Sequence, residues 1–92
     1  MSFEWDEAKA RANLLKHGVD FEDAIRIFEG PTLEHQDTRR DYREVRVQAL
    51  GQIGNQVLFV VYVRRGRVRR IISARGAGSD EREAYRQAID TS

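Results

Sequence analysis

The sequence predicts an α+β fold with two N-terminal helices, a small antiparallel sheet of about four strands and a C-terminal helix. Three observations predict it. Residues 57–63 are apolar or aromatic and mostly β-branched, which is typical of a central strand covered on both faces. Gly66 lies in a turn signal that leads into a second strand over about 68–75, so a hairpin is expected. Segments of helix-forming residues lie on either side of this sheet region.

The length and composition predict one domain over residues 1–92 with a thin core. The chain has no cysteine and two histidines, so we expect no metal site, no cofactor and a reducing, cytoplasmic setting. The N-terminus lacks the features of a signal peptide, and no apolar run approaches the roughly 20 residues that a membrane span needs. A protein without a membrane segment is therefore expected.

The first helix is predicted after a short strand or extended lead-in that turns Phe3 and Trp5 inward. Asp6 has the position of an N-cap, and Gly18 supplies the stop. Spacings of three and four predict a packing stripe of Ala8, Ala12 and Leu15. The same spacings place four polar residues on a neighbouring face, namely Lys9, Asn13, Lys16 and His17.

The second helix is predicted to start after Asp20 and to end at Gly30-Pro31, because proline cannot continue a helix. Its apolar stripe consists of Phe21, Ala24, Ile25 and Phe28. Residues 32–36 are predicted to form a first strand of the main sheet, and residues 37–41 a polar loop.

The rest of the sheet is predicted as a meander followed by a helix. Residues 45–49 alternate apolar and polar side chains, as in a strand with one wet face, and residues 50–55 predict a bulge and a turn. Ser79 is a candidate cap for the last helix. The packing stripe of that helix is expected to consist of Ala84, Tyr85, Ala88 and Ile89.

Charge is strongly segregated along the chain. Residues 39–75 hold ten arginines and two acidic residues, although the whole chain has a net charge of +1. Six of these arginines lie on the predicted hairpin with no acidic residue among them: Arg64, Arg65, Arg67, Arg69, Arg70 and Arg75. This density favours a polyanionic partner such as nucleic acid, although a solvated mixture of charges would also account for it.

Two segments resemble a known family. They are FEWDEAKARANLLKHGVDFEDA at residues 3–24 and RIISARGAGSDERE at residues 70–83, and with the strand between them they are similar to the BrnT family of bacterial toxins. The resemblance implies a RelE-like fold and a ribonuclease that inhibits translation and growth. It also implies a cognate BrnA-like antitoxin with a ribbon-helix-helix part, through which alone the complex would reach operator DNA.

RNA can be cut without a metal ion if a base, an acid and cations surround the reacting phosphate. His17 is the candidate for proton transfer, because it adjoins the polar face that carries Lys9 and Lys16. The alternative is that His17 merely interacts with the C-terminus of its helix. His35 is expected to be an exposed surface residue, and Tyr62 a core residue with its hydroxyl satisfied.

Arg75 is the candidate for contact with the phosphate, because a guanidinium stabilises a transferring phosphoryl group. In a regular strand Arg67, Arg69, Ile71, Ser73 and Arg75 share one face, and Val68, Arg70, Ile72 and Ala74 face the helices. Arg70 conflicts with this unless it snorkels, pairs with an acid or marks a bulge at Arg69-Arg70.

We therefore expect RNA contacts from Arg67, Arg69 and Ser73, and RNA binding by general attraction from Arg64 and Arg65, with the arginines gathered on one open side of the sheet. The alternative is that the arginines form ion pairs within the chain or with a partner. The competing hypotheses are that the chain is a non-catalytic nucleic-acid-binding module or a protein-interaction module.

Overall fold

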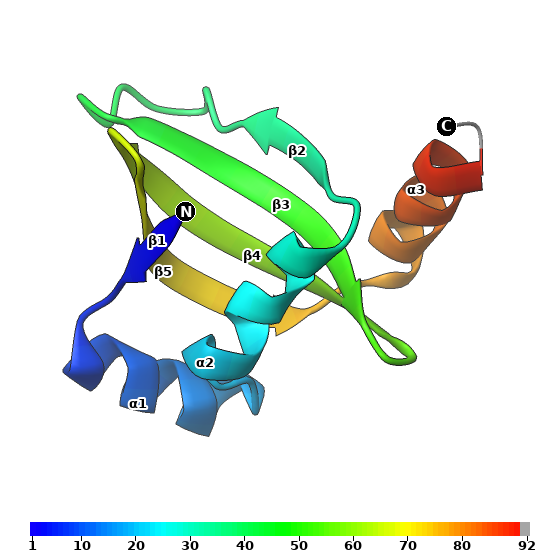
Figure 1. Ribbon diagram of the computed structural model, residues 1–92, viewed down its shortest axis with the longest axis horizontal. Coiled ribbons are helices and arrows are strands. Elements are labelled where there is room, and N and C mark those ends of the chain that lie inside the picture. The colour runs from blue at the N-terminus through cyan, green and yellow to red at the C-terminus, as the bar shows by residue number, and fades with distance from the viewer. Residues whose placement is uncertain (91–92) are drawn as a thin grey trace.

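The computed structural model describes residues 1–90 and shows a five-stranded sheet with helices on both faces (Figure 1). In chain order the elements are β1 (Ser2–Glu4), α1 (Glu7–His17), α2 (Phe21–Ala24), the 3₁₀ helix η1 (Ile25–Glu29), β2 (Leu33–Gln36), β3 (Val45–Ile53), β4 (Gln56–Arg65), β5 (Val68–Gly76) and α3 (Ser79–Asp90). The order of strands across the sheet is β1-β5-β4-β3-β2. The α+β class and the β2–β5 meander are confirmed.

The prediction of an antiparallel sheet of about four strands is wrong in one respect. β1 joins the sheet as a fifth strand and runs parallel to β5, with Phe3 opposite Arg69. β5 would otherwise be an edge strand with unpaired backbone groups, and β1 pairs part of that edge. The sheet is therefore mixed.

The larger core lies between the sheet and the N-terminal helices. Phe21, Ile27, Val60 and Tyr62 are all completely buried in it. The Tyr62 hydroxyl donates a hydrogen bond to the Glu34 carboxylate, so the predicted core role of this tyrosine is confirmed. The partly buried residues Phe3, Trp5, Ala10, Ile25, Phe28 and Ile53 pack against this core.

α1 is held against β5 by an amide and not by the predicted apolar stripe. Ala8 and Ala12 are exposed, and Leu15 is 89% exposed. Asn13 is buried, and its Nδ2 donates to the carbonyls of Ala74 (2.8 Å) and Val19 (3.0 Å) while its Oδ1 accepts from the Ala74 N–H (3.1 Å). Asn13 thus pairs the edge of β5 beyond the end of β1, where two backbone groups would otherwise lack partners.

The second predicted helix tightens into a 3₁₀ turn after Ala24. Its predicted stripe is largely confirmed, since Phe21 and Ala24 are buried and Ile25 and Phe28 half-buried, but the 3₁₀ turn also buries Ile27. Ile27 packs so closely on β3 that a Cβ added at Gly51 would lie 2.5 Å from the Ile27 Cβ. Gly51 therefore lets the η1 helix approach the backbone of β3 closely. The bulge predicted in residues 50–55 is absent, because β3 continues in regular pairing to Ile53.

α3 covers one end of the opposite face of the sheet. Tyr85 is buried against Leu50, Val57 and Ala77, and its hydroxyl donates to the Pro31 carbonyl (2.8 Å). Toward the β4–β5 turn, no helix within residues 1–90 covers this face of the sheet (Figure 1). We call this side the open face. No helix in residues 1–90 combines the length and the apolar character needed to cross a membrane.

The loop between β2 and β3 is organised by a buried carboxylate. Asp37 accepts hydrogen bonds from the Arg39 guanidinium at 2.9 and 3.0 Å and from the Tyr42 hydroxyl at 3.2 Å. The hydrogen bonds from Arg39 hold the pKa of the Asp37 carboxyl far below its usual range. This part of the chain therefore depends on the ionised form of Asp37.

Substitution Asp37→Asn is expected to destabilise the protein most near neutral pH. Because the folded-state pKa is lowered, the stabilisation is complete above the ordinary carboxyl pKa of about 4 and is lost as the pH falls from there toward the folded-state pKa. The difference in Tm between wild type and Asp37→Asn should therefore shrink between about pH 7 and pH 3. An equal difference at both values, or one no larger than that of the exposed control Asp90→Asn, would contradict this account.

Candidate functional site

A bulge in β5 decides which arginines share a face. In its pairing with β4, Val61 lies opposite Ser73 but Tyr62 lies opposite Ile71, so Ile72 is the extra residue. Of the three explanations considered for Arg70, a bulge is the one that sets its face, but the bulge lies at Ile72 and not at Arg69-Arg70. The second explanation, a pair with an acid, is also observed, because Arg70 lies 3.8 Å from the Glu4 carboxylate. Arg70, Ser73 and Arg75 share the open face, whereas Arg69 lies on the helix-covered face with Ile71 and Ala74.

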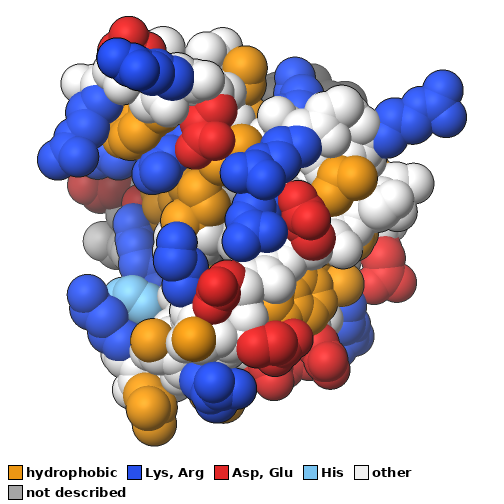
Figure 2. All heavy atoms as spheres, turned by 90° about the vertical axis from the view of Figure 1, so that its left-hand side faces the viewer, with side chains coloured by type: hydrophobic (Ala, Val, Ile, Leu, Met, Phe, Trp, Pro, Cys, Tyr) orange, Lys and Arg blue, Asp and Glu red, His pale blue; other side chains and the backbone are white. Residues whose placement is uncertain are grey.

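The arginines are consequently not gathered on one side of the sheet, and that expectation is wrong. Arg69 stacks over the rings of Phe28 and Tyr62, with its guanidinium carbon 4.8 and 5.2 Å from the ring centroids. Arg65 and Arg70 lie within 4.0 Å of the Glu4 carboxylate. Lys and Arg side chains spread over the surface beside β1 and α1, with Asp and Glu between them (Figure 2).

Arg75 is fixed in one position on the open face. Its Nη1 and Nη2 each donate to an oxygen of Glu81 at 2.8 Å, Nη1 also donates to the Gly76 carbonyl, and the guanidinium carbon lies 4.2 Å from the centre of the Phe59 ring. The hydrogen bonds from Arg75 hold the pKa of the Glu81 carboxyl below its usual range. Arg75 therefore forms an ion pair within the chain, which was the alternative to phosphate contact.

The pairing with Glu81 still leaves Arg75 able to bind an anion. A guanidinium has five N–H donors in one plane, and Glu81 occupies the end of that plane through Nη1 and Nη2. The side edge, formed by Nε and the second proton of Nη2, donates to no group in residues 1–90. Glu81 therefore orients a guanidinium whose free edge suits the two oxygens of a phosphate.

The polar residues of α1 lie beside the same part of β5. Lys9 precedes Asn13 by four residues, and Lys16 and His17 follow it by three and four, so all three share the side of the helix that Asn13 presents to β5. Each is exposed, and none forms an ion pair with another residue in the range 1–90. Ala74, which Asn13 contacts, stands between Ser73 and Arg75 in the sequence.

A second basic cluster surrounds the β4–β5 turn. Arg64, Arg67 and Arg69 line a hollow of about 280 Å³ together with Met1 and Gly66. The Nε of Arg69 is buried there without a hydrogen-bond partner in the described chain. Three of the predicted RNA-binding residues are thus brought together at this turn. They are separate from Ser73 and Arg75, which lie on the open face.

The open face also contains polar residues that were not predicted to belong to a site. Arg46 and Gln48 project from β3, and His35 lies opposite Gln48 on β2. The alternation in residues 45–49 placed Arg46 and Gln48 on a wet face, which is the signal that could have identified them. His35 is exposed, as predicted.

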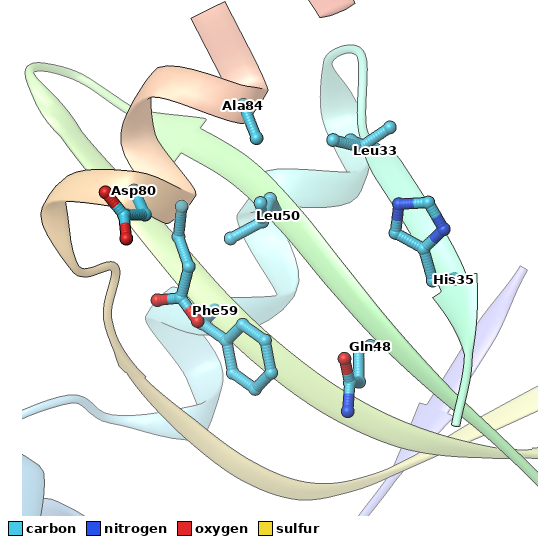
Figure 3. Close-up of a pocket in the computed structure, with 8 residues that line it drawn as sticks. Leu33, His35, Gln48, Leu50, Phe59, Asp80 and Ala84 are labelled. Carbon is cyan, nitrogen blue, oxygen red and sulfur yellow. The ribbon is translucent and has the colours of Figure 1, made fainter. Parts of the chain in front are cut away.

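His35 and Gln48 line a hollow of about 250 Å³ between the open face and the first turns of α3 (Figure 3). Its other lining residues are Leu33, Leu50, Phe59, Asp80, Glu81 and Ala84. We call this hollow the α3 pocket. It adjoins Arg75, since Arg75 contacts both Phe59 and Glu81.

No three histidine, cysteine, aspartate or glutamate side chains within residues 1–90 are grouped so that they could hold a metal ion. The chemical groups that the site does offer are guanidinium, ammonium and imidazole. These are the groups that donate hydrogen bonds to phosphate and transfer protons near neutral pH.

Comparison with models of protein families gives a match over most of the chain. The model of a family described as ribonuclease toxin, BrnT, of type II toxin-antitoxin system matches residues 5–81. No curated protein matches the chain. The matched range contains α1, the whole β2–β5 meander and Arg75.

Proposed function

Because the chain belongs to the BrnT family of ribonuclease toxins of type II toxin–antitoxin systems, we propose that it cuts RNA without a metal ion at the edge of β5. The observation that carries this proposal is the free side edge of the Arg75 guanidinium. The exposed Lys9, Lys16 and His17 support it, because they share the side of α1 that Asn13 fixes at Ala74, the residue before Arg75. Cutting cellular RNA in the cytoplasm would inhibit translation and growth. The arrangement of helices on a small sheet supports a RelE-like fold as part of the same proposal.

The reaction proposed is an attack of the RNA 2′-hydroxyl on the adjacent phosphorus. The 2′-oxygen forms a bond to phosphorus and gives up its proton to a base, while the bond to the leaving 5′-oxygen breaks and that oxygen takes a proton from an acid. The products are a 2′,3′-cyclic phosphate and a 5′-hydroxyl. His17 is proposed to transfer protons, with Lys9 and Lys16 supplying positive charge, and Arg75 to hold the phosphate oxygens as charge develops on them.

The family also implies an antitoxin partner and an RNA target. We propose that the antitoxin is BrnA-like, that it contains a ribbon-helix-helix part and that the complex reaches operator DNA only through it. The exposed Leu14 and Leu15 on α1 support a contact with a protein partner, because they lie on the outer side of a helix whose inner side is already packed on β5.

Arg64, Arg67 and Arg69 are proposed to attract the RNA backbone without reading its sequence. Substitution Arg67→Ala is expected to weaken RNA binding equally for unrelated sequences and to reduce the slope of log Kd against log salt by about 0.7. Fluorescence anisotropy over a range of salt concentrations measures this slope. Arg26 in η1 is the control, because it lies near Ile53 and Gln56 at the other end of β4 from the β4–β5 turn. Arg26→Ala should leave the slope unchanged. An unchanged slope in Arg67→Ala would exclude this role.

The proposed function is tested by incubating the purified chain with RNA in EDTA and analysing the ends of the fragments. We expect cleavage in EDTA, 2′,3′-cyclic phosphate and 5′-hydroxyl ends, and resistance of any position carrying a single 2′-deoxyribose. Intact RNA with salt-dependent binding would instead show a non-catalytic nucleic-acid-binding module. Cleavage that requires Mg²⁺ would overturn the metal-free mechanism.

A further inference from the structure

We propose that the α3 pocket binds one nucleobase carrying an exocyclic amino group, next to the phosphate held by Arg75. The inference rests on the proposed ribonuclease function and adds a base-recognition site to it. It follows from the shape of the pocket, from polar groups in it that lack partners, and from its position beside Arg75.

The floor of the pocket is apolar and is built by one row across the sheet. Leu33 lies opposite Leu50, Leu50 opposite Phe59, and Phe59 opposite Arg75. Leu50 is buried and Phe59 half-buried, so the floor is fixed by the core beneath α3. An apolar floor suits the face of a base, whatever its identity.

The rim of the pocket holds polar groups that can read the edge of a base. Figure 3 shows Gln48 and His35 on one side of Leu50 and Asp80 on the other. None of these three side chains makes a hydrogen bond with the part of the chain that the structure describes. Gln48 offers both a donor and an acceptor, as in the bidentate recognition of adenine, and the Asp80 carboxylate only accepts.

The two carboxylates at the pocket decide what its occupant can be. Glu81 is already neutralised by Arg75, but Asp80 has no cation paired with it within residues 1–90. A phosphate would be repelled by Asp80, whereas an amino group of adenine, cytosine or guanine would donate to it. Uracil has no amino group and presents carbonyl oxygens beside its single N–H, so it should be disfavoured.

The position of Arg75 links the pocket to the reaction. Arg75 covers the Phe59 ring on the floor and binds Glu81 on the wall. A nucleotide whose phosphate lies on the free edge of Arg75 can therefore place its base in the adjoining pocket. Base binding at this site would set which phosphodiester bond lies at Arg75.

Titration of the full chain with the four nucleoside 3′-monophosphates, followed by NMR, tests the proposal. We expect shifts at Gln48 and Phe59, with the amino-bearing nucleotides binding about tenfold tighter than the uridine nucleotide. Asp80→Asn should reduce this preference to less than about threefold, because an amide can also donate to a carbonyl. Gln48→Ala should weaken binding of all four, and Asp90→Asn on the same helix should behave as wild type.

Equal affinity for the four nucleotides, or shifts away from the pocket, would overturn the proposal. A second result would also overturn it: Asp80→Asn binds nucleotides as wild type does but is no longer neutralised by the antitoxin. The pocket would then be a contact surface for the antitoxin. Failure of the ribonuclease proposal is seen separately, as intact RNA after incubation with the wild-type chain.

Discussion

Replacement of Arg75 with lysine is expected to lower the rate of RNA cleavage by about 10²- to 10³-fold. Lysine keeps the positive charge but has no planar edge, so it cannot hold two phosphate oxygens while Glu81 occupies its other donors. Arg75→Ala should lose at least as much activity. The rate is measured on a short RNA with one cleavage site, at saturating protein.

A matched control separates loss of chemistry from loss of structure. Arg86 lies exposed on α3, and Arg86→Lys should cleave at the wild-type rate. The Tm of Arg75→Lys should stay close to that of wild type, because the Arg75–Glu81 pair is partly exposed and such pairs contribute little to stability. Cleavage within about threefold of wild type in Arg75→Lys and Arg75→Ala would rule out the role given to this residue.

Replacement of Asn13 with alanine is expected to lower the free energy of unfolding by roughly 2–4 kcal/mol, because it leaves buried backbone groups unsatisfied. The Ala74 N–H and carbonyl and the Val19 carbonyl all lose their partner. Asn13→Asp should be destabilising as well near neutral pH, since a carboxylate cannot donate to the two carbonyls. Urea denaturation measures the change.

Asn55 in the β3–β4 turn provides the control for this substitution. It is exposed, and Asn55→Ala should change the free energy of unfolding by less than about 0.5 kcal/mol. If Asn13→Ala were equally mild, the amide would not be what docks α1 on the edge of β5. The placement of Lys9, Lys16 and His17 on the side of α1 that meets β5 at Ala74 would then lose its support.

Local signals predicted the elements well because capping chemistry acts over a few residues. Asp6 and Asp20 accept backbone N–H groups at the starts of their helices, and Gly18 ends α1 in the left-handed conformation. The apolar run at residues 57–63 became the central strand, buried on both faces at most positions. Each of these features depends on the neighbouring sequence alone.

The errors came from interactions between distant segments. Periodicity ranked Ala8, Ala12 and Leu15 as the packing side of α1, but the helix meets the edge of a strand, where backbone groups need hydrogen bonds more than apolar cover. The bulge at Ile72 depends on the register between β4 and β5, which the sequence of β5 does not reveal. Because of this one extra residue, Arg69 and Arg70 each lie on the face of the sheet opposite to the one predicted.

The candidate site was predictable only in part for the same reason. Arg75 was identified from the IISAR segment that resembles the BrnT family, and His17, Lys9 and Lys16 from their spacing on one helix. Their catalytic roles remain predictions. The α3 pocket is assembled from β2, β3, β4 and α3, so no single stretch of sequence contains its pattern. The partner of Arg75 on α3, Glu81, likewise became visible only in the fold.

The central claim, that RNA is bound at the junction of α1, β5 and the open face, is tested most directly by NMR with an RNA that cannot be cut. A short 2′-O-methyl RNA titrated into the wild-type chain should shift the signals of Ser73, Arg75 and the Lys9–His17 side of α1 together. Shifts confined to α2, η1 and the helix-covered face, or confined to the β4–β5 turn, would contradict it.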